Sequence, residues 1–260
     1  MPLEGLRLAS FLVGLFTLLS WELTAPHHAP TVPRARRWVA NLVFAATNGI
    51  VVSAVCFVCY VIAERGSVPW RLGPLQQLVM PLWLRLTGEV LVLDLLVYFL
   101  HRAYHGYPLL WRFHLVHHSD RDLDVTSASR FHLGEVTISG AAKFGTVQLL
   151  GISPTGLIGF EIVMLAAAQL QHANIRLPNA VESSLWLAFV PPAMHRVHHH
   201  PLRAATDSNF GTLVSFWDRL FGTLRPAAPS DREFGLPTLP DERALGPLRL
   251  FLLPFRRTRR

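Results

Sequence analysis

The sequence predicts an all-α fold, an integral-membrane helical bundle with about three spanning helices and a helical hairpin. Hydrophobic residues make up 51% of the 260 residues and charged residues only 16%, whereas a soluble domain carries roughly 25% charged residues. Four long apolar stretches follow one another along the chain. Most of the histidines lie in short motifs after residue 100, directly beyond the third stretch.

Three of the apolar stretches are each long enough to cross a bilayer, which takes about 20 residues. They run from Leu6 to Leu23, from Trp38 to Ala63 and from Leu75 to Leu100. The fourth, at about 136–171, is interrupted by Gly-Ile-Ser-Pro-Thr-Gly at 151–156, and glycine and proline mark turns. We expect a membrane hairpin here, with a single long span as the alternative. Residues 1–100 should form membrane-spanning helices and residues 101–260 a histidine-rich catalytic region, within one continuous domain.

The charge pattern predicts which side of the membrane this region faces. The net charge of +7 rests almost entirely on arginine. A basic chain suits nucleic acid or an anionic membrane surface, and the apolar stretches favour the membrane and no nucleic acid. Arginines gather at 34–37 and after residue 100, which the positive-inside rule assigns to the cytoplasm. We expect an inner or plasma membrane protein whose histidine motifs face the cytoplasm.

Eight of the 13 histidines form three motifs, one H-x3-H and two H-x2-H-H. Residues three and four apart share one face of a helix, so each motif presents two or three imidazoles to one side. Imidazole binds iron, copper and zinc. A single zinc ion usually takes four ligands, so this number of histidines predicts a dinuclear metal centre. The eight are His101, His105, His114, His117, His118, His195, His198 and His199.

Three further residues are candidates for this site. His172 follows the fourth apolar stretch, and a hairpin would return it to the same end as the motifs. His132 lies in Arg-Phe-His at 130–132. Asp94 precedes His101 by two helical turns and could accept a hydrogen bond that orients a ligand imidazole, with a polar contact between helices as the alternative.

From Asp94 to Thr223 the chain resembles the fatty acid hydroxylase superfamily, which includes sterol desaturases and related lipid hydroxylases. The resemblance rests on the three histidine motifs, W-R-F-H at 111–114, V-T-S-A-S-R-F-H at 125–132, T-D-S-N-F-G at 206–211 and W-D-R-L-F-G-T at 217–223. Asp207 and Asn209, in the third of these segments, are candidates to hold ligand histidines in place. Ala168 stands where some members have a further histidine.

The resemblance implies a helical membrane fold with a cytoplasmic cap that holds two non-haem iron ions. The eight histidines, with His172 and His132, would be the ligands, and no other catalytic side chain is expected. O2 would be the co-substrate in hydroxylation of a C–H bond of a lipid, whether fatty acyl, sterol or related. The 260 residues include no haem domain of the cytochrome b5 type, so electrons would come from a separate ferredoxin- or cytochrome-type reductase system.

Two alternatives stay open from the residues. A lipid desaturase would use the same di-iron centre, because the histidine pattern does not separate hydroxylation from desaturation. A membrane metal-binding or transport protein is an alternative of another class. Transport ligands lie near the bilayer midplane, whereas these motifs lie at the ends of the apolar stretches.

Overall fold

The computed structural model describes the chain except residues 1, 65–72, 229, 231, 240–245 and 257–260, and the side chains of 2–4 and 55–64 are likewise not described. The described residues form helices and loops, and their only β-structure is an isolated bridge between Phe189 and Val214. The helices are α1 Pro2–Thr24, α2 Arg34–Glu64, α3 Pro74–Gln77, α4 Leu82–Gly106, α5 Pro108–His118, η2 Val125–Ser129, α6 Leu133–Leu150, α7 Pro154–His172, α8 Asn179–Ala188, α9 Pro192–His198, α10 Arg203–Thr206, α11 Phe216–Leu220, α12 Pro247–Leu252 and η4 Leu253–Phe255.

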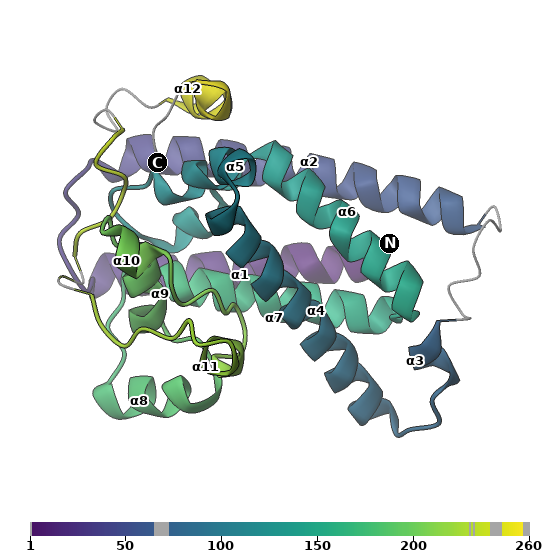
Figure 1. Cartoon of the computed structure of the whole chain (residues 1–260). Helices are drawn as coiled ribbons and strands as arrows, with labels where there is room; N and C mark the ends of the chain where they lie inside the picture. Colours follow the sequence, from purple (N-terminus) through teal and green to yellow (C-terminus); the bar gives the residue numbers. More distant parts are fainter. Residues whose placement is uncertain (1, 65–72, 229, 231, 240–245, 257–260) are drawn as a thin grey trace.

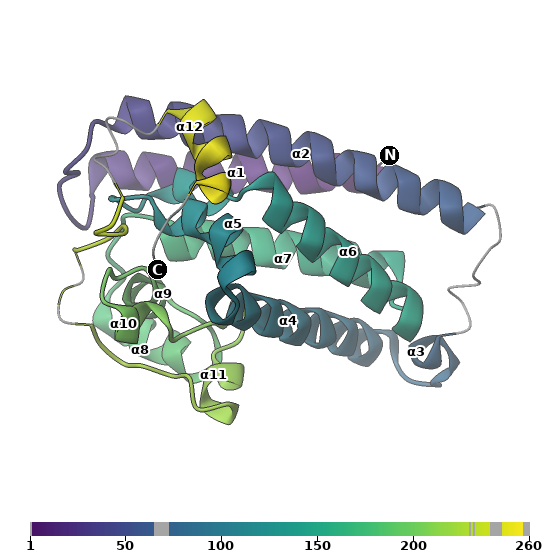
Figure 2. The same cartoon turned by 45° about the horizontal axis from the view of Figure 1, so that its top comes forward.

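The long helices run lengthwise through the molecule, and the short helices α8 to α11 gather at one end (Figures 1 and 2). Helix α7 packs against α1 and α4, and α2 packs against α6. Helix α3 lies at the opposite end from α10 in both views. The bundle therefore has two distinct ends, and the histidine motifs of α4, α5 and α9 lie at the end with the short helices.

Helices α6 and α7 form a helical hairpin, and its expected place in a membrane stays a prediction. Gly151 ends α6 in the left-handed conformation with φ of 70°, which glycine adopts without strain. Ser153 caps α7 by accepting a hydrogen bond from Gly156 N at 3.0 Å. The buried Glu89 carboxylate of α4 accepts from Ser153 N at 3.0 Å and from Ser153 Oγ at 2.6 Å. The turn is thus fastened to α4, and the chain reverses here instead of continuing as one span.

Prolines place the ends of α4 and α5. The third apolar stretch was expected to be helical from Leu75, but α3 ends at Gln77 and α4 begins only at Leu82. Pro81 explains the break, because proline disfavours a helical residue before it. Tyr107 is extended between α4 and α5, and Pro108 occupies the first turn of α5, where proline is well accommodated. This corner folds the second histidine motif back over the first.

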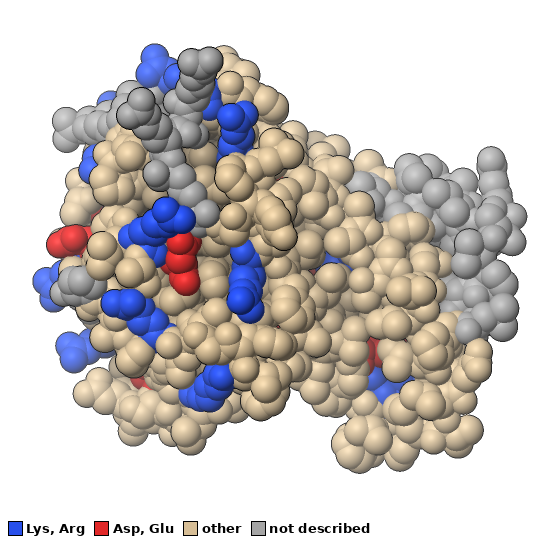
Figure 3. All heavy atoms as spheres, in the orientation of Figure 1, with Lys and Arg blue, Asp and Glu red and all other residues tan. Residues whose placement is uncertain are grey.

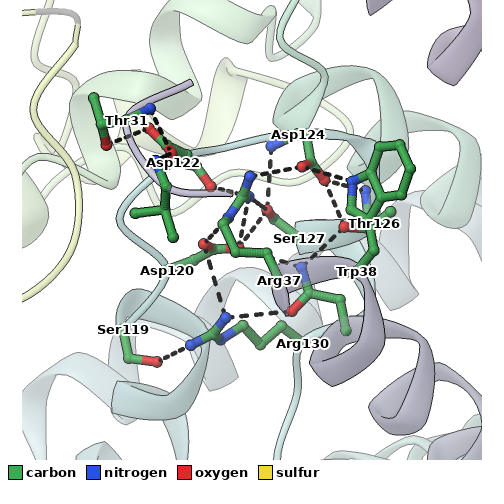
Figure 4. A network of polar contacts seen from close by, with 12 residues as sticks. Thr31, Arg37, Trp38, Ser119, Asp120, Asp122, Asp124, Thr126, Ser127 and Arg130 are labelled. Atoms are coloured by element: carbon green, nitrogen blue, oxygen red, sulfur yellow. Dashed lines mark hydrogen bonds and ion pairs between the residues drawn. The ribbon is translucent and has the colours of Figure 1, made fainter. Parts of the chain in front are cut away.

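A buried ion-pair network ties the start of α2 to the segment after α5 (Figure 4). Arg37 is 3% exposed, and its guanidinium pairs with Asp120 at 2.6 Å and Asp124 at 2.7 Å. Arg130, also buried, donates to Val116 O at 3.1 Å and Ser119 Oγ at 2.8 Å. Burial by itself raises the pKa of Asp120, but Arg37 and Arg130 hold that pKa below its ordinary value. Arg37 and Arg130 are among the loop arginines that predict the cytoplasmic side, but both are buried and add no charge to the surface.

One helix in the described part of the chain is long and apolar enough to cross a membrane, residues 5–24 of α1. Only 11% of this stretch is buried, and large apolar side chains such as Val13 and Phe16 are exposed on it. The other expected spans, including the end of the second stretch that lies outside the described side chains, stay predictions.

The close approach of Gly156 to Glu89 gives a test of the hairpin turn. A Cβ at Gly156 would overlap the Glu89 carboxylate, so Gly156→Ala should lower the free energy of unfolding by about 1–3 kcal/mol, as overpacking does. Gly159→Ala is the matched control on the same helix, because a Cβ there meets no atom within 4 Å. Thermal unfolding in detergent measures both variants. Equal midpoints for the two would contradict the described turn.

Candidate metal centre

Nine of the ten predicted histidine ligands come together in two groups. The first histidine group is His101, His105, His114, His118 and His198, and the second is His117, His172, His195 and His199. Within each group, one nitrogen per ring lies within 4.8 Å of the others. All nine side chains are buried except His101, which is half-buried. The groups adjoin, since the His118 and His199 rings stack with centroids 4.5 Å apart. Each group can therefore hold one metal ion beside the other.

The two H-x2-H-H motifs divide between the groups in opposite ways. In α5, His114 and His118 join the first group and His117 joins the second. Around α9, His195 and His199 join the second group and His198 joins the first. Residues at i+3 and i+4 differ by about 100° around a helix axis. One motif can therefore reach two adjacent metal positions, instead of presenting all its imidazoles to one.

Outward hydrogen bonds orient the rings of the first group. His101 Nδ1 lies 2.9 Å from Phe210 O, and His198 Nδ1 lies 2.7 Å from Ser208 O. His114 Nδ1 lies 2.8 Å from Glu135 Oε1. A backbone carbonyl only accepts hydrogen bonds, so the Nδ1 atoms of His101 and His198 carry the proton and their Nε2 atoms present a lone pair to the interior. Lone pairs that converge in a buried space are stabilised by a cation, and this donor set fits a metal ion.

The nitrogens of the second histidine group are also arranged to hold a metal ion. His172 Nδ1 donates to Ala168 O at 2.7 Å, so its Nε2 is the free acceptor. His172 Nε2 lies 3.2 Å from His117 Nε2 and 3.1 Å from His195 Nε2, and His195 Nε2 lies 3.1 Å from His199 Nε2. Two nitrogens bound to one metal at about 2.1 Å are themselves about 3.0–3.4 Å apart at tetrahedral or octahedral angles. The spacing therefore matches shared coordination.

Burial keeps these imidazoles neutral. It lowers the pKa of His198 to about 3 and that of His172 to about 4. Burial, together with the neighbouring imidazoles, holds the pKa of His117, His118 and His195 well below the ordinary value. Metal binding requires the neutral form of histidine, so the site is ready for metal at neutral pH.

Asp207 and Asn209 hold the site in different ways. Asp207 Oδ1 lies 3.2 Å from His105 Nδ1, so it contacts a candidate ligand directly. Asn209 does not contact an imidazole within the described structure. Its side chain donates to Met194 O at 3.0 Å and accepts from Arg225 N at 2.7 Å, which fixes the backbone beside His195. Its φ of 54° is one that asparagine adopts more readily than most residues.

The hydrogen bonds that Asp94 accepts come from residues 213–217, and its predicted role in orienting a ligand imidazole stays a prediction. Its carboxylate accepts from Leu213 N at 3.0 Å, Val214 N at 3.3 Å and Trp217 Nε1 at 2.8 Å. Seven residues along a helix correspond to about 10 Å, which separates Asp94 from His101. Asp94 holds the loop whose Phe210 carbonyl receives the His101 hydrogen bond.

His132 lies outside both groups. Its Nδ1 accepts from Gly134 N at 3.0 Å, which makes it the cap of α6, and its Nε2 lies 3.1 Å from Phe251 O. Both ring nitrogens therefore already have backbone partners. His132 therefore caps α6 and is a member of neither histidine group.

Two carboxylates that the sequence analysis did not name as candidates, Glu135 and Asp218, also help to arrange the site. Glu135 is buried and binds His114, and the Tyr104 hydroxyl donates to its backbone carbonyl at 3.1 Å. Its signal in the sequence is an acid at the very start of an apolar stretch. Asp218, in the W-D-R-L-F-G-T segment, accepts from Phe210 N and Gly211 N, both at 2.8 Å. It therefore shapes the loop that orients His101.

The fold and the site define a helical protein with two histidine groups that are able to hold metal ions. The sequence profile described as fatty acid hydroxylase matches residues 86–223, which include both groups and the loop around Asp218. The chain belongs to the fatty acid hydroxylase family.

The individual relatives include enzymes named for different lipids. Ornithine lipid hydroxylase of Rhizobium tropici is 32% identical over 141 residues, 54% of this chain and 42% of the relative. Cholesterol 25-hydroxylase of Homo sapiens is 25% identical over 140 residues, 54% of this chain and 50% of the relative. Alkylglycerol monooxygenase of Caenorhabditis elegans is 27% identical over 138 residues, 53% of this chain and 26% of the relative. The chain thus matches half or less of each relative's length. No solved structure matches it.

The lowered histidine pKa values predict how stability depends on pH. In the unfolded chain these histidines titrate near a pKa of about 6.5, so the unfolded state takes up protons first as pH falls. The metal-free protein should keep full stability above about pH 6.5 and lose it progressively below, towards the folded pKa of about 4 for His172. Unfolding midpoints of chelator-treated protein between pH 8 and pH 5 measure this effect. A midpoint that stays constant over that interval would show that the histidines are not buried in the neutral form.

Proposed function

We propose that the protein is a membrane-bound di-iron oxygenase that hydroxylates a C–H bond of a lipid. The observation that carries this proposal is the pair of adjacent, buried histidine groups whose Nε2 lone pairs converge. The overall reaction would convert the lipid C–H bond, O2, two electrons and two protons into a lipid alcohol and water. Two electrons reduce one oxygen atom to water, and the other oxygen atom enters the lipid.

The first histidine group would hold one iron ion and the second group the other. Iron bound in this way supplies the activation of O2 that no amino-acid side chain provides. The protein's own contribution is a fixed and dry ligand set. Outward hydrogen bonds to Phe210, Ser208 and Ala168 carbonyls fix the rings. The Phe131 ring stacks on His117 at 4.3 Å and excludes water from that side.

The relatives support hydroxylation over desaturation. All three relatives named above are called hydroxylase or monooxygenase. Metal transport is disfavoured by the position of the ligands, because His101 and His105 lie in the last turns of α4 and His172 ends α7. The substrate would be a lipid, since each named relative acts on a lipid according to its name.

Surface character supports a membrane location with the histidine end in the cytoplasm. In Figure 3 the arginines gather over the end that carries α9 to α11, and the described residues drawn on this face towards α3 include few charged groups. Apolar side chains exposed there include Leu84, Leu149 and Val163. Large exposed apolar surfaces mark contact with a membrane or a partner. The bilayer would surround the long helices, and a lipid would reach the irons laterally from it.

Metal content tests the ligand assignment. The purified protein should contain about two iron ions per chain, as dinuclear sites do. His117→Ala and His198→Ala each remove a ligand from a different group and should each lower the iron content. His132→Asn is the control, since asparagine can still cap α6 and His132 lies outside both groups. Full iron content in both alanine variants would sink the assignment.

Lipid analysis tests the reaction. Extracts from cells with and without the protein would be compared by mass spectrometry, and a lipid that gains one oxygen atom is expected only where the protein is present. The His198→Ala variant should abolish that product because an iron ligand is lost. A loss of two hydrogens instead would identify a desaturase, and no change in any lipid would refute the oxygenase proposal.

A further inference from the structure

Carboxylates and guanidinium groups divide unequally between the interior and the surface. Among the described residues, the buried acids are Glu22, Glu89, Asp94, Asp120, Asp122, Asp124, Glu135 and Asp218, whereas the buried arginines are Arg37, Arg130 and Arg196. The surface is therefore more basic than the formal charge of +7 suggests. Figure 3 shows that the exposed arginines gather at the histidine end, around few acidic groups.

One ion pair on this surface leads directly to the candidate metal ligands. Arg203, whose side chain is 71% exposed, donates from Nε to Asp207 Oδ2 at 3.1 Å. Asp207, 29% exposed, contacts His105 Nδ1 with its other oxygen at 3.2 Å. By comparison, the Glu135 carboxylate that orients His114 is only 7% exposed. Asp207 is thus the single residue that separates His105 of the first histidine group from the exposed Arg203.

A second arginine, Arg225, lies near this ion pair. Arg225 Nη1 donates to Ala204 O at 3.1 Å, which places its guanidinium beside α10. Helix α10 lies at the opposite end of the molecule from α3 in both cartoon views. With the bilayer around the long helices, this surface points away from the lipid and towards water. It therefore suits a soluble partner better than lipid headgroups.

We propose that the surface centred on Arg203 and Arg225 docks an acidic one-electron carrier protein of the ferredoxin type, which passes electrons inwards through Asp207 and His105. This inference rests on the proposed function, which consumes two electrons in each turnover. Two reduced carriers would each be oxidised by one electron, and the iron centre would receive both. Complementary charge is what steers such encounters and fixes their orientation.

Direct binding tests this surface independently of catalysis. The iron-loaded full-length protein in detergent would be titrated with a plant-type [2Fe–2S] ferredoxin at low salt. Arg203→Gln with Arg225→Gln should weaken binding about tenfold and reduce its salt dependence. Arg85→Gln, beside α3 at the opposite end, is the matched control and should bind like the unaltered protein. Unchanged ferredoxin binding by the double variant would overturn the proposal.

Reduction kinetics test the electron route. The rate of iron reduction by reduced ferredoxin would be divided by the rate with photoreduced deazaflavin, a small donor that needs no docking surface. This ratio should fall about tenfold in the double variant, and an unchanged ratio would overturn the proposed route.

If the double variant instead loses binding only to phosphatidylglycerol vesicles, the surface is a lipid contact and the proposal is wrong. Ferredoxin binding without any oxidised lipid would refute the proposed function but leave the docking surface standing.

Discussion

Imidazole lone pairs that converge in a dry interior are the constraint on which the rest of this structure depends. The rings are turned inwards because their other nitrogen donates outwards, as His101 does to Phe210 O and His172 to Ala168 O. Rotating such a ring would leave a buried donor without a partner, at a cost of about 1–3 kcal/mol. The ends of α4, α5, α7 and α9 must therefore meet within a few ångströms, and the helical bundle supplies that meeting point.

Buried carboxylates organise the loops around this centre. Burying a carboxylate is costly unless it is paired or hydrogen-bonded. Glu22, Glu89, Asp94 and Asp218 each accept two or more N–H or O–H groups. Asp94 and Asp218 together hold the loop that presents Phe210 O. Glu22 accepts from Val125 N and Asn174 N, both at 2.7 Å, and so joins α1 to the segments beside the second group. Because many of the acids lie inside the fold, arginines dominate the surface at the histidine end.

The hairpin connects the apolar part of the bundle to the two histidine groups. Its first helix carries Glu135 in its first turn, where it contacts His114, and its second helix ends with His172 in the second group. Lys143 and Glu161 form an ion pair between the two helices, and Glu89 fastens the turn at the far end. The hairpin thus has contacts with α4 at its turn and with both histidine groups at its other end.

The sequence by itself determined the helical class, the hairpin turn and nine of the ligand candidates, because helical spacing and glycine–proline turns are local properties. Only the tertiary structure decided which group each histidine joins, since that depends on how α5 and α9 face each other. It also decided that Asp94 serves a loop 119 residues away, that His132 caps α6, and that Arg37 and Arg130 are internal. Such pairings join residues far apart in the chain, and only packing brings them together.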